Sequence, residues 1–313
     1  MPTLIPSFYP SFRCEPSRCH HSCCVDWEIG IDEDSLCAYR TRTDALAKEI
    51  VSHIAPSPQP HFILTVGERC PFLQDDGLCS LISREGETVL PEICREHPRF
   101  RNFYGEDFVE LSLGLSCEIA AELLFREENL HFLISPMEID SLTQEYATER
   151  FSDLTALPKE DEAFLQAKYR ILFSLLENGT LPSIPDTQGY EENARLALRT
   201  LLKLEALNVD FATLFDAREV ESFLFDAESP SRFSDNEKKN LLAMTFFRHA
   251  SAESFYTIPT ALAFSKFFVS LVDYLATIKH YDKVEAVRIL SSEIEYSEEN
   301  TDRLLDIFEG IDG

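Results

Sequence analysis

The sequence is short of positive charge, and this shortage excludes several classes of partner. Lys and Arg number 28 against 55 Asp and Glu, so the formal net charge is −27. Because contacts to phosphate need a basic face, this balance argues against a nucleic-acid binder and against docking on an anionic membrane surface. It allows a basic, lysine-bearing protein partner, although a solvated acidic surface explains the same excess.

Glycine is also scarce, and long uninterrupted apolar runs are missing. None of the ten glycines lies in a G-x-G-x-G loop after a strand, so a doubly wound nucleotide-binding fold is not indicated. The start, MPTLIPSFYPSF, has three prolines and no basic segment, unlike a signal peptide. The most apolar stretch, 258–278, carries Lys266 and Asp273 and predicts a buried helix rather than a membrane span. We therefore expect a cytoplasmic protein with no nucleic-acid or membrane partner.

Cysteine is absent from residues 118–313, although nine cysteines precede them. Core cysteines would be scattered along the chain, and disulfides are rare in the reducing compartment expected here. Metal ligation is the better explanation, against buried apolar thiols that cluster by chance. The candidate ligands are Cys14, Cys19, Cys23, Cys24, Cys70, Cys79, Cys94 and Cys117. The ninth, Cys37, falls inside a helical pattern and is predicted to be a small core residue.

The cysteine spacings suit loops around a metal centre. Cys14-x4-Cys19-x3-Cys23-Cys24 lies on a loop-like segment, and Cys70-x8-Cys79 encloses a glycine. Such turns let backbone amides approach a thiolate or sulfide sulfur. Four thiolates suit tetrahedral zinc or a cubane cluster, but the spacings form neither two CxxC knuckles nor the radical CxxxCxxC pattern. Neighbouring side chains in extended backbone point to opposite sides, so Cys23 and Cys24 need not ligate the same centre.

The chain is predicted to be mainly α-helical, and the irregular cysteine-rich pattern gives way to a helical pattern after residue 135. Residues 1–135 form an irregular cysteine-rich metal-binding domain with short extended segments, and 136–313 form a helical bundle domain. In the first part we expect a helix at 35–54, a proline-rich loop at 55–60, extended segments at 61–66 and 109–116, a hairpin at 78–90 around Glu85-Gly86, and a helix from Cys117 through Phe125.

The second part shows helical periodicity throughout. The expected helices are 138–154, 160–177, 190–207, 213–226, 235–249, 258–279, 282–295 and 298–309. Ser234 with Glu237 predicts a capping box at the fifth, and Asn178-Gly179 ends the second. Phe and Leu recur at three- and four-residue spacing, which is typical of a bundle core rather than of a cofactor site.

Three segments together resemble the flagellin lysine-N-methylase family, the FliB-type proteins. They are FRCEPSRCHHSCCVDWEIGID, RCPFLQDDGLCSLISREGETVLPEICREHPRF and LSLGLSC, and SSEIEYSEEN resembles the end of the same family. The resemblance implies S-adenosylmethionine-dependent methylation of lysines on flagellin or another exported protein. It also implies an iron–sulfur cluster, which favours 4Fe–4S over zinc. Because no glycine-rich loop is present, S-adenosylmethionine would have to be held by other means.

Charged side chains beside the cysteines are candidates for binding S-adenosylmethionine. Arg95 and Arg99 could clamp its carboxylate and Asp26 its amine, while His97 could ligate metal or simply belong to a loop. Alternatively, both arginines neutralise a net-negative thiolate cluster. No catalytic residue is identified. The competing function is a non-catalytic zinc or iron–sulfur protein, such as a carrier or redox sensor.

Overall fold

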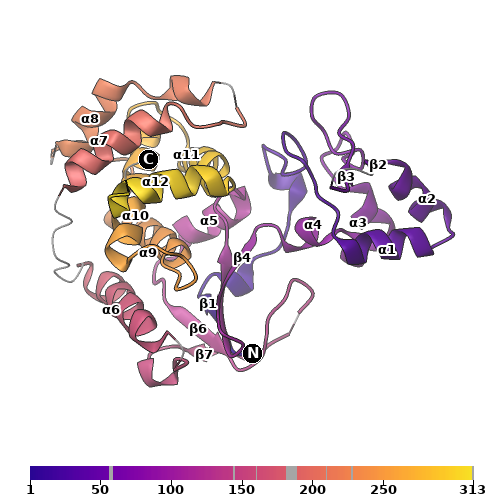
Figure 1. Cartoon of the computed structure of the whole chain (residues 1–313), viewed down its shortest axis with the longest axis horizontal. Helices are drawn as coiled ribbons and strands as arrows, with labels where there is room; N and C mark the ends of the chain where they lie inside the picture. Colours follow the sequence, from indigo (N-terminus) through magenta and orange to yellow (C-terminus); the bar gives the residue numbers. More distant parts are fainter. Residues whose placement is uncertain are drawn as a thin grey trace. The chain divides into compact units, whose positions relative to one another are not determined.

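The computed structural model describes residues 1–55, 59–143, 145–159, 161–180, 189–208, 210–226 and 228–311. The chain divides into two compact units (Figure 1). Unit 1 contains residues 1–12 and 100–313, and unit 2 contains residues 13–99. The predicted boundary at 135/136 lies inside unit 1, and independent folding of residues 136–313 stays a prediction.

The first residues of the chain belong to unit 1 because they form the central strand of its sheet. The sheet has five strands in the order β4-β5-β1-β6-β7. Strand β1, Thr3–Pro6, runs parallel to β5, Phe108–Leu113, and antiparallel to β6, Phe132–Ser135. All residues of β1 and β5 are buried, as expected of strands covered on both faces. The remaining strands are β4, Arg99–Tyr104, and β7, Glu149–Arg150.

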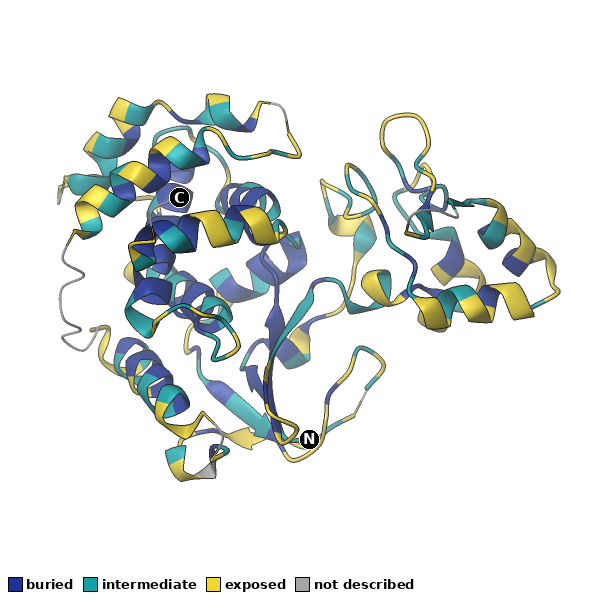
Figure 2. Cartoon of the chain, in the orientation of Figure 1, coloured by how far each residue is buried: buried dark blue, intermediate teal, exposed yellow. Residues whose placement is uncertain are grey.

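Helices make up most of unit 1. They are α5, Glu118–Arg126; α6, Glu162–Asn178; α7, Tyr190–Leu201; α8, Ala217–Phe225; α9, Asp235–His249; α10, Ile258–Thr277; α11, Lys283–Leu290; and α12, Glu298–Glu309. A π-helical turn, Ser291–Glu295, extends α11. Helix α10 packs against α6, α8, α9, α11 and α12. Figure 2 shows buried residues gathered on the inner faces of these helices.

The predicted burial of α10 is confirmed. By length and composition it is the one helix in the described part of the chain that could cross a membrane. Most of its residues are nevertheless buried inside unit 1. This is the pattern of a core helix, as the sequence analysis expects.

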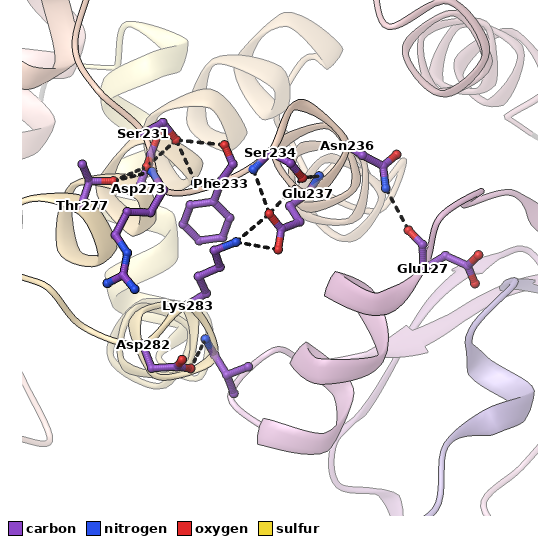
Figure 3. Close-up of polar contacts among 12 residues, drawn as sticks. Glu127, Ser231, Phe233, Ser234, Asn236, Glu237, Asp273, Thr277, Asp282 and Lys283 are labelled. Carbon is purple, nitrogen blue, oxygen red and sulfur yellow. Dashed lines mark hydrogen bonds and ion pairs between the residues drawn. The ribbon is translucent and has the colours of Figure 1, made fainter.

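The predicted helix signals at the ends of α9 and α6 are confirmed. The Ser234 hydroxyl accepts from the Glu237 amide at 3.2 Å, and the Glu237 carboxylate accepts from the Ser234 amide at 2.8 Å. The same carboxylate pairs with Lys283 at 2.7 Å, which ties α11 to α9 (Figure 3). Helix α6 ends at Gly179, whose φ of +66° suits glycine.

Unit 2 contains short elements around a small core. They are α1, Glu33–Thr41; α2, Ala45–Ser52; β2, Ile54–Ala55; β3, His61–Phe62; α3, Ser80–Glu85; and α4, Glu92–Glu96. Strands β2 and β3 pair antiparallel. Part of the predicted 55–60 loop, residues 56–58, lies outside the described residues. The extended segment predicted at 61–66 is a strand only over its first two residues.

Two predictions in the cysteine-rich part need correction. The helix at 35–54 is divided into α1 and α2, because the Asp44 side chain accepts from the Ala47 amide and starts a new helix. The hairpin at 78–90 is wrong, because residues 80–85 form α3 and Gly86, at φ +81°, ends it. Glu85-Gly86 is typical of a hairpin turn, but glycine at this φ equally ends a helix.

In the second part the helix predicted at 138–154 is wrong. Its described residues form turns, the short strand β7 and one 3-10 turn at Leu154–Ala156. The Asp140 carboxylate accepts from the Leu142 amide at 2.9 Å and the Thr143 hydroxyl at 2.7 Å, which replaces the helical pattern with a local turn. The helices predicted at 190–207 and 213–226 are present but shorter, as α7 and α8.

Candidate functional site

Four of the candidate ligands lie together in unit 2. Cys70 is buried in its core, and Cys24, Cys79 and Cys94 pack against that core. The Cys70 amide donates to the Cys24 carbonyl at 2.8 Å. The charges of Cys24, Cys70 and Cys79 all act on Cys94. The structure therefore places four thiols, which we call the four-cysteine cluster, at the core of unit 2 from positions far apart in the sequence.

The four thiols differ in how readily they ionise. Burial raises the pKa of Cys70 to about 12 and raises that of Cys94 well above 9. The pKa of Cys24 is lowered to about 7, because hydrogen bonds from Cys23 and Ser22 outweigh its burial. Cys24 is thus the first of the four to become a thiolate, and a bound cation would favour ionisation of the others.

Backbone amides lie near the buried sulfurs, as expected for turns that enclose cysteine ligands. The amides of Phe72 and Leu73 face Cys70 and oppose the rise in its pKa. Those of Leu81 and Ile82 do the same for Cys79, which is the N-cap residue of α3. Such amides stabilise negative charge on thiolate or sulfide.

The chemistry of these four thiols is that of zinc or iron ligands, but their placement does not form a metal-binding group. No three His, Cys, Asp or Glu side chains of the described residues are close enough together to hold a single metal ion. Zinc would need sulfurs about 2.3 Å from one ion. Thiolates around a multi-iron cluster lie further apart, because the cluster occupies the space between them. Whether the four-cysteine cluster holds zinc or an iron–sulfur cluster stays a prediction.

The other candidate cysteines have different settings. Cys14 and Cys23 are exposed and Cys19 is partly exposed. Cys117 belongs to unit 1, where it is the N-cap residue of α5. Whether these four ligate metal stays a prediction.

The prediction that Cys37 is a core residue is wrong. Cys37 is exposed. Helix α1 is buried through Tyr39, whose hydroxyl donates to the Val89 carbonyl at 2.7 Å. Residues two apart on a helix point to different faces, so Cys37 faces solvent when Tyr39 faces the core.

The charged candidates Arg95 and Arg99 contact backbone carbonyls in unit 2. Arg95 Nη1 donates to the Leu90 carbonyl at 3.1 Å, and Arg99 Nη1 donates to the Arg95 carbonyl at 3.3 Å. Both contacts brace the segment around α4 that carries Cys94. Asp26 is exposed, with a positive φ of 69°. The role of Asp26, Arg95 and Arg99 in cofactor binding stays a prediction.

Two rings from segments distant in the sequence of unit 2 contact each other. The rings of Trp27 and His97 are 5.8 Å apart, and the Trp27 indole donates to the Cys23 carbonyl. Trp27 thus packs beside the segment that carries Cys23.

Unit 1 contains a buried ion pair that the sequence analysis missed. Lys168 Nζ lies 2.5 Å from Glu110 Oε2, and both side chains are fully buried. Lys168 also donates to the Phe247 carbonyl at 2.8 Å, and the Tyr169 hydroxyl donates to Glu110. Burial lowers the pKa of Lys168, and the Glu110 carboxylate opposes that shift. The ammonium thus neutralises Glu110 and caps the C-terminus of α9.

A second polar cluster lies at the π-helical turn of unit 1. Glu295 Oε1 is 2.8 Å from His249 Nε2 and 3.5 Å from Arg248 Nε. The Arg248 guanidinium lies 4.8 Å from the Phe100 ring centre and 5.4 Å from that of Tyr296. Arg248 Nη1 and Glu295 Oε2 are buried without a partner among the described residues. Turns of this type are frequent at functional sites.

One signal in the sequence points to this second cluster. Glu295 and Tyr296 belong to SSEIEYSEEN, the segment that resembles the end of the methylase family. Helical periodicity alone could not identify them, because it does not show which charged residue of a helix is buried. The charge of Cys117 also acts on Tyr296, which places a candidate metal ligand near this cluster.

We expect Glu295 to stabilise the fold in a pH-dependent way. Burial alone would raise its pKa, but Arg248 and then His249 outweigh burial and lower the pKa from 4.5 to about 2. A lowered carboxyl pKa stabilises the fold above 4.5, and this contribution is lost as the pH falls from 4.5 toward 2. It amounts to roughly 3 kcal/mol at neutral pH.

Urea unfolding of wild type and Glu295→Gln across this pH range checks that expectation. The difference in unfolding free energy should be largest at neutral pH and should shrink with acidification. Glu128→Gln, at an exposed position, is the matched control and should give a small, pH-independent difference. A Glu295→Gln difference that is constant with pH would contradict the prediction.

Comparisons with known proteins find relatives for part of the chain. The chain is 29% identical over 134 residues to proteins named Lysine-N-methylase from Salmonella typhimurium and Salmonella choleraesuis. The match covers 38% of this chain and 31% of theirs, so it spans about a third of their length. The chain is also 28% identical over 131 residues to Flagellar biosynthetic protein FliU from Salmonella muenchen, covering 75% of that protein. No family model and no solved structure matches the chain. The resemblance to the flagellin lysine-N-methylase family is therefore confirmed, and over 38% of its length the chain is related in sequence to that family.

Proposed function

We propose that this protein is an S-adenosylmethionine-dependent lysine N-methyltransferase that modifies flagellin or another lysine-bearing exported protein. We also propose that unit 2 holds an iron–sulfur cluster of the 4Fe–4S type. The similarity to proteins named Lysine-N-methylase carries the first proposal. The second is supported by the four-cysteine cluster, whose thiols act electrostatically on one another around one core.

The reaction sets clear demands on the protein. A sulfonium methyl group is attacked by a neutral amine, so the substrate lysine must lose a proton and align with the methyl group. An excess of acidic residues would raise the local concentration of a lysine-bearing substrate. The cluster, when bound, would supply an iron centre that cross-links the four cysteines of unit 2.

Two groups of residues are candidates for holding S-adenosylmethionine. The first is Asp26, Arg95 and Arg99 in unit 2. The second is Arg248 with Glu295 in unit 1, which pair through Arg248 Nε and Glu295 Oε1 at 3.5 Å but leave Arg248 Nη1 and Glu295 Oε2 without a hydrogen-bond partner among the described residues. A donor and an acceptor of this kind suit the carboxylate and the ammonium of an amino-acid group. Small movements of side chains would be needed to admit it, because both atoms are buried.

A methylation assay tests the enzymatic proposal. Anaerobically purified, cluster-loaded protein mixed with flagellin and S-adenosylmethionine should add increments of one CH2 mass to lysine side chains, as read by mass spectrometry. Arg95→Ala and Asp26→Ala should reduce turnover while iron content is kept, if these residues hold the cofactor. Arg84→Ala is the matched control, because Arg84 is an exposed arginine of the same unit that pairs with Glu49.

Two outcomes would count against parts of this proposal. If iron content falls in parallel with activity in Arg95→Ala, the arginine braces the cluster through its contact with the Leu90 carbonyl. If cluster-loaded, folded protein has no affinity for S-adenosylmethionine, the non-catalytic alternative, a metal carrier or redox sensor, is favoured. The backbone contacts of Arg95 and Arg99 are the observation that keeps this alternative open.

A further inference from the structure

Unit 1 has an open groove of about 770 Å³ that the proposed chemistry does not use. It lies against α9 and α10, and the ends of α6, α7 and α8 contribute to it. Three lysines line it, Lys238, Lys239 and Lys266, with Asp235 as the one acidic side chain in the lining that the structure describes. Leu242 and Val269 add apolar surface. We call this feature the lysine groove.

The three lysines are not equivalent. Lys238 pairs with Asp273 at 2.8 Å. Asp273 also accepts from the hydroxyls of Ser231 at 2.9 Å and Thr277 at 2.8 Å (Figure 3). Lys238 is therefore held to the wall of the groove, and its charge is neutralised there.

Lys239 and Lys266 carry the available positive charge. Lys239 Nζ contacts only the Leu176 carbonyl, at 3.4 Å, and neither lysine has a carboxylate partner among the described residues. Lys266 is exposed although both its neighbours on α10, Ser265 and Phe267, are buried. In a chain with 55 acidic and 28 basic residues, two lysines without carboxylate partners beside one groove are unexpected.

The charge and shape of the groove decide what it can bind. Its ammonium groups would repel the sulfonium of S-adenosylmethionine and the ammonium of a substrate lysine. They would attract carboxylates, and the apolar surface beside them would bury an aliphatic side chain. Because the groove is open rather than enclosed, it suits a chain segment passing through it better than an enveloped small molecule.

We propose that the lysine groove binds an acidic, partly apolar segment of the protein substrate. Carboxylates of the segment contact Lys239 and Lys266, and an aliphatic side chain packs on Leu242 and Val269. The identity of the partner rests on the proposed methyltransferase function, whereas the binding of an acidic segment does not. The groove thus selects substrates that carry acidic residues away from the lysine to be methylated.

Peptide binding to the full-length protein tests the groove without methylation. The probe is a fluorescein-labelled peptide of alternating Glu and Leu, followed by anisotropy. The double variant Lys239→Gln/Lys266→Gln should weaken binding about tenfold, because two solvent-accessible ion pairs are lost. Lys48→Gln/Lys203→Gln, at two exposed lysines elsewhere, is the matched control and should bind as wild type does. The effect should diminish with added salt.

Three results would overturn the proposal. The first is equal affinity of wild type and the groove variant for the peptide, with melting curves showing that both are folded. The second is equal binding of a Gln-for-Glu peptide. The third is competition by glutarate, a small dicarboxylate, as strong as that by the unlabelled peptide, which would make the groove a small-anion site.

Kinetics with flagellin separate this proposal from the proposed function. If methylation occurs, the groove variant should raise KM for flagellin with little change in kcat, and an unchanged KM would exclude flagellin as the occupant. If folded, cluster-loaded protein has no affinity for S-adenosylmethionine but the acidic peptide binds through Lys239 and Lys266, the groove stands and the methyltransferase proposal fails.

Discussion

Replacing Lys168 by Met is expected to lower the free energy of unfolding by about 3–5 kcal/mol, because it leaves a buried carboxylate without its counter-charge. The ammonium lies 2.5 Å from Glu110 Oε2 and 2.8 Å from the Phe247 carbonyl at the end of α9. Met fills a similar volume but offers neither charge nor hydrogen bonds. Urea unfolding followed by circular dichroism measures the change.

A double-mutant cycle separates the pair from its surroundings. Adding Glu110→Gln to Lys168→Met removes the uncompensated charge, so the double variant should be more stable than the sum of the two single changes predicts. Lys203→Met, at an exposed lysine, should change stability by less than about 0.5 kcal/mol. A Lys168→Met effect as small as that of Lys203→Met would show that Glu110 finds another partner or a proton at little cost.

The second large effect is expected at the four-cysteine cluster. Cys70→Ser, Cys79→Ser and Cys94→Ser should each abolish stable cluster binding and lower the melting temperature, because metal binding is coupled to folding. Wild-type protein purified without oxygen should contain iron and labile sulfide and absorb broadly in the visible range. Iron and sulfide assays on each variant give the readout. Cys37→Ser is the matched control and should be neutral, because Cys37 is exposed on α1.

The iron content of serine variants at the remaining cysteines shows how many of them are ligands. If the four-cysteine cluster is sufficient, Cys14→Ser, Cys19→Ser and Cys117→Ser will retain iron. Loss of iron in any of these would extend the ligand set toward the eight cysteines that the sequence indicates. Stoichiometric zinc without sulfide would reject the cluster but keep the metal site. Folded wild-type protein with neither metal would reject both.

The elements that were predicted correctly have strong local signals. Helix α9 starts where Ser234 and Glu237 form a capping box, and α6 ends where Gly179 adopts a positive φ. The elements that were predicted wrongly have local signals that fit two structures. Gly86 can close a hairpin or end a helix, and the apolar spacing at 138–154 is compatible with a helix until Asp140 closes a turn on Leu142 and Thr143.

The sequence by itself determined the segregation of cysteine before residue 118, the helical character of most of the second part and the resemblance to the methylase family. These features are compositional or local, so neighbouring residues suffice to show them. The tertiary structure alone decided that β1 joins the sheet of unit 1, that Cys24, Cys70, Cys79 and Cys94 share the core of unit 2, and that Glu110 pairs with Lys168. Each of these contacts joins residues distant in the chain, and its stability comes from burial and charge compensation in the folded protein, which no local pattern encodes.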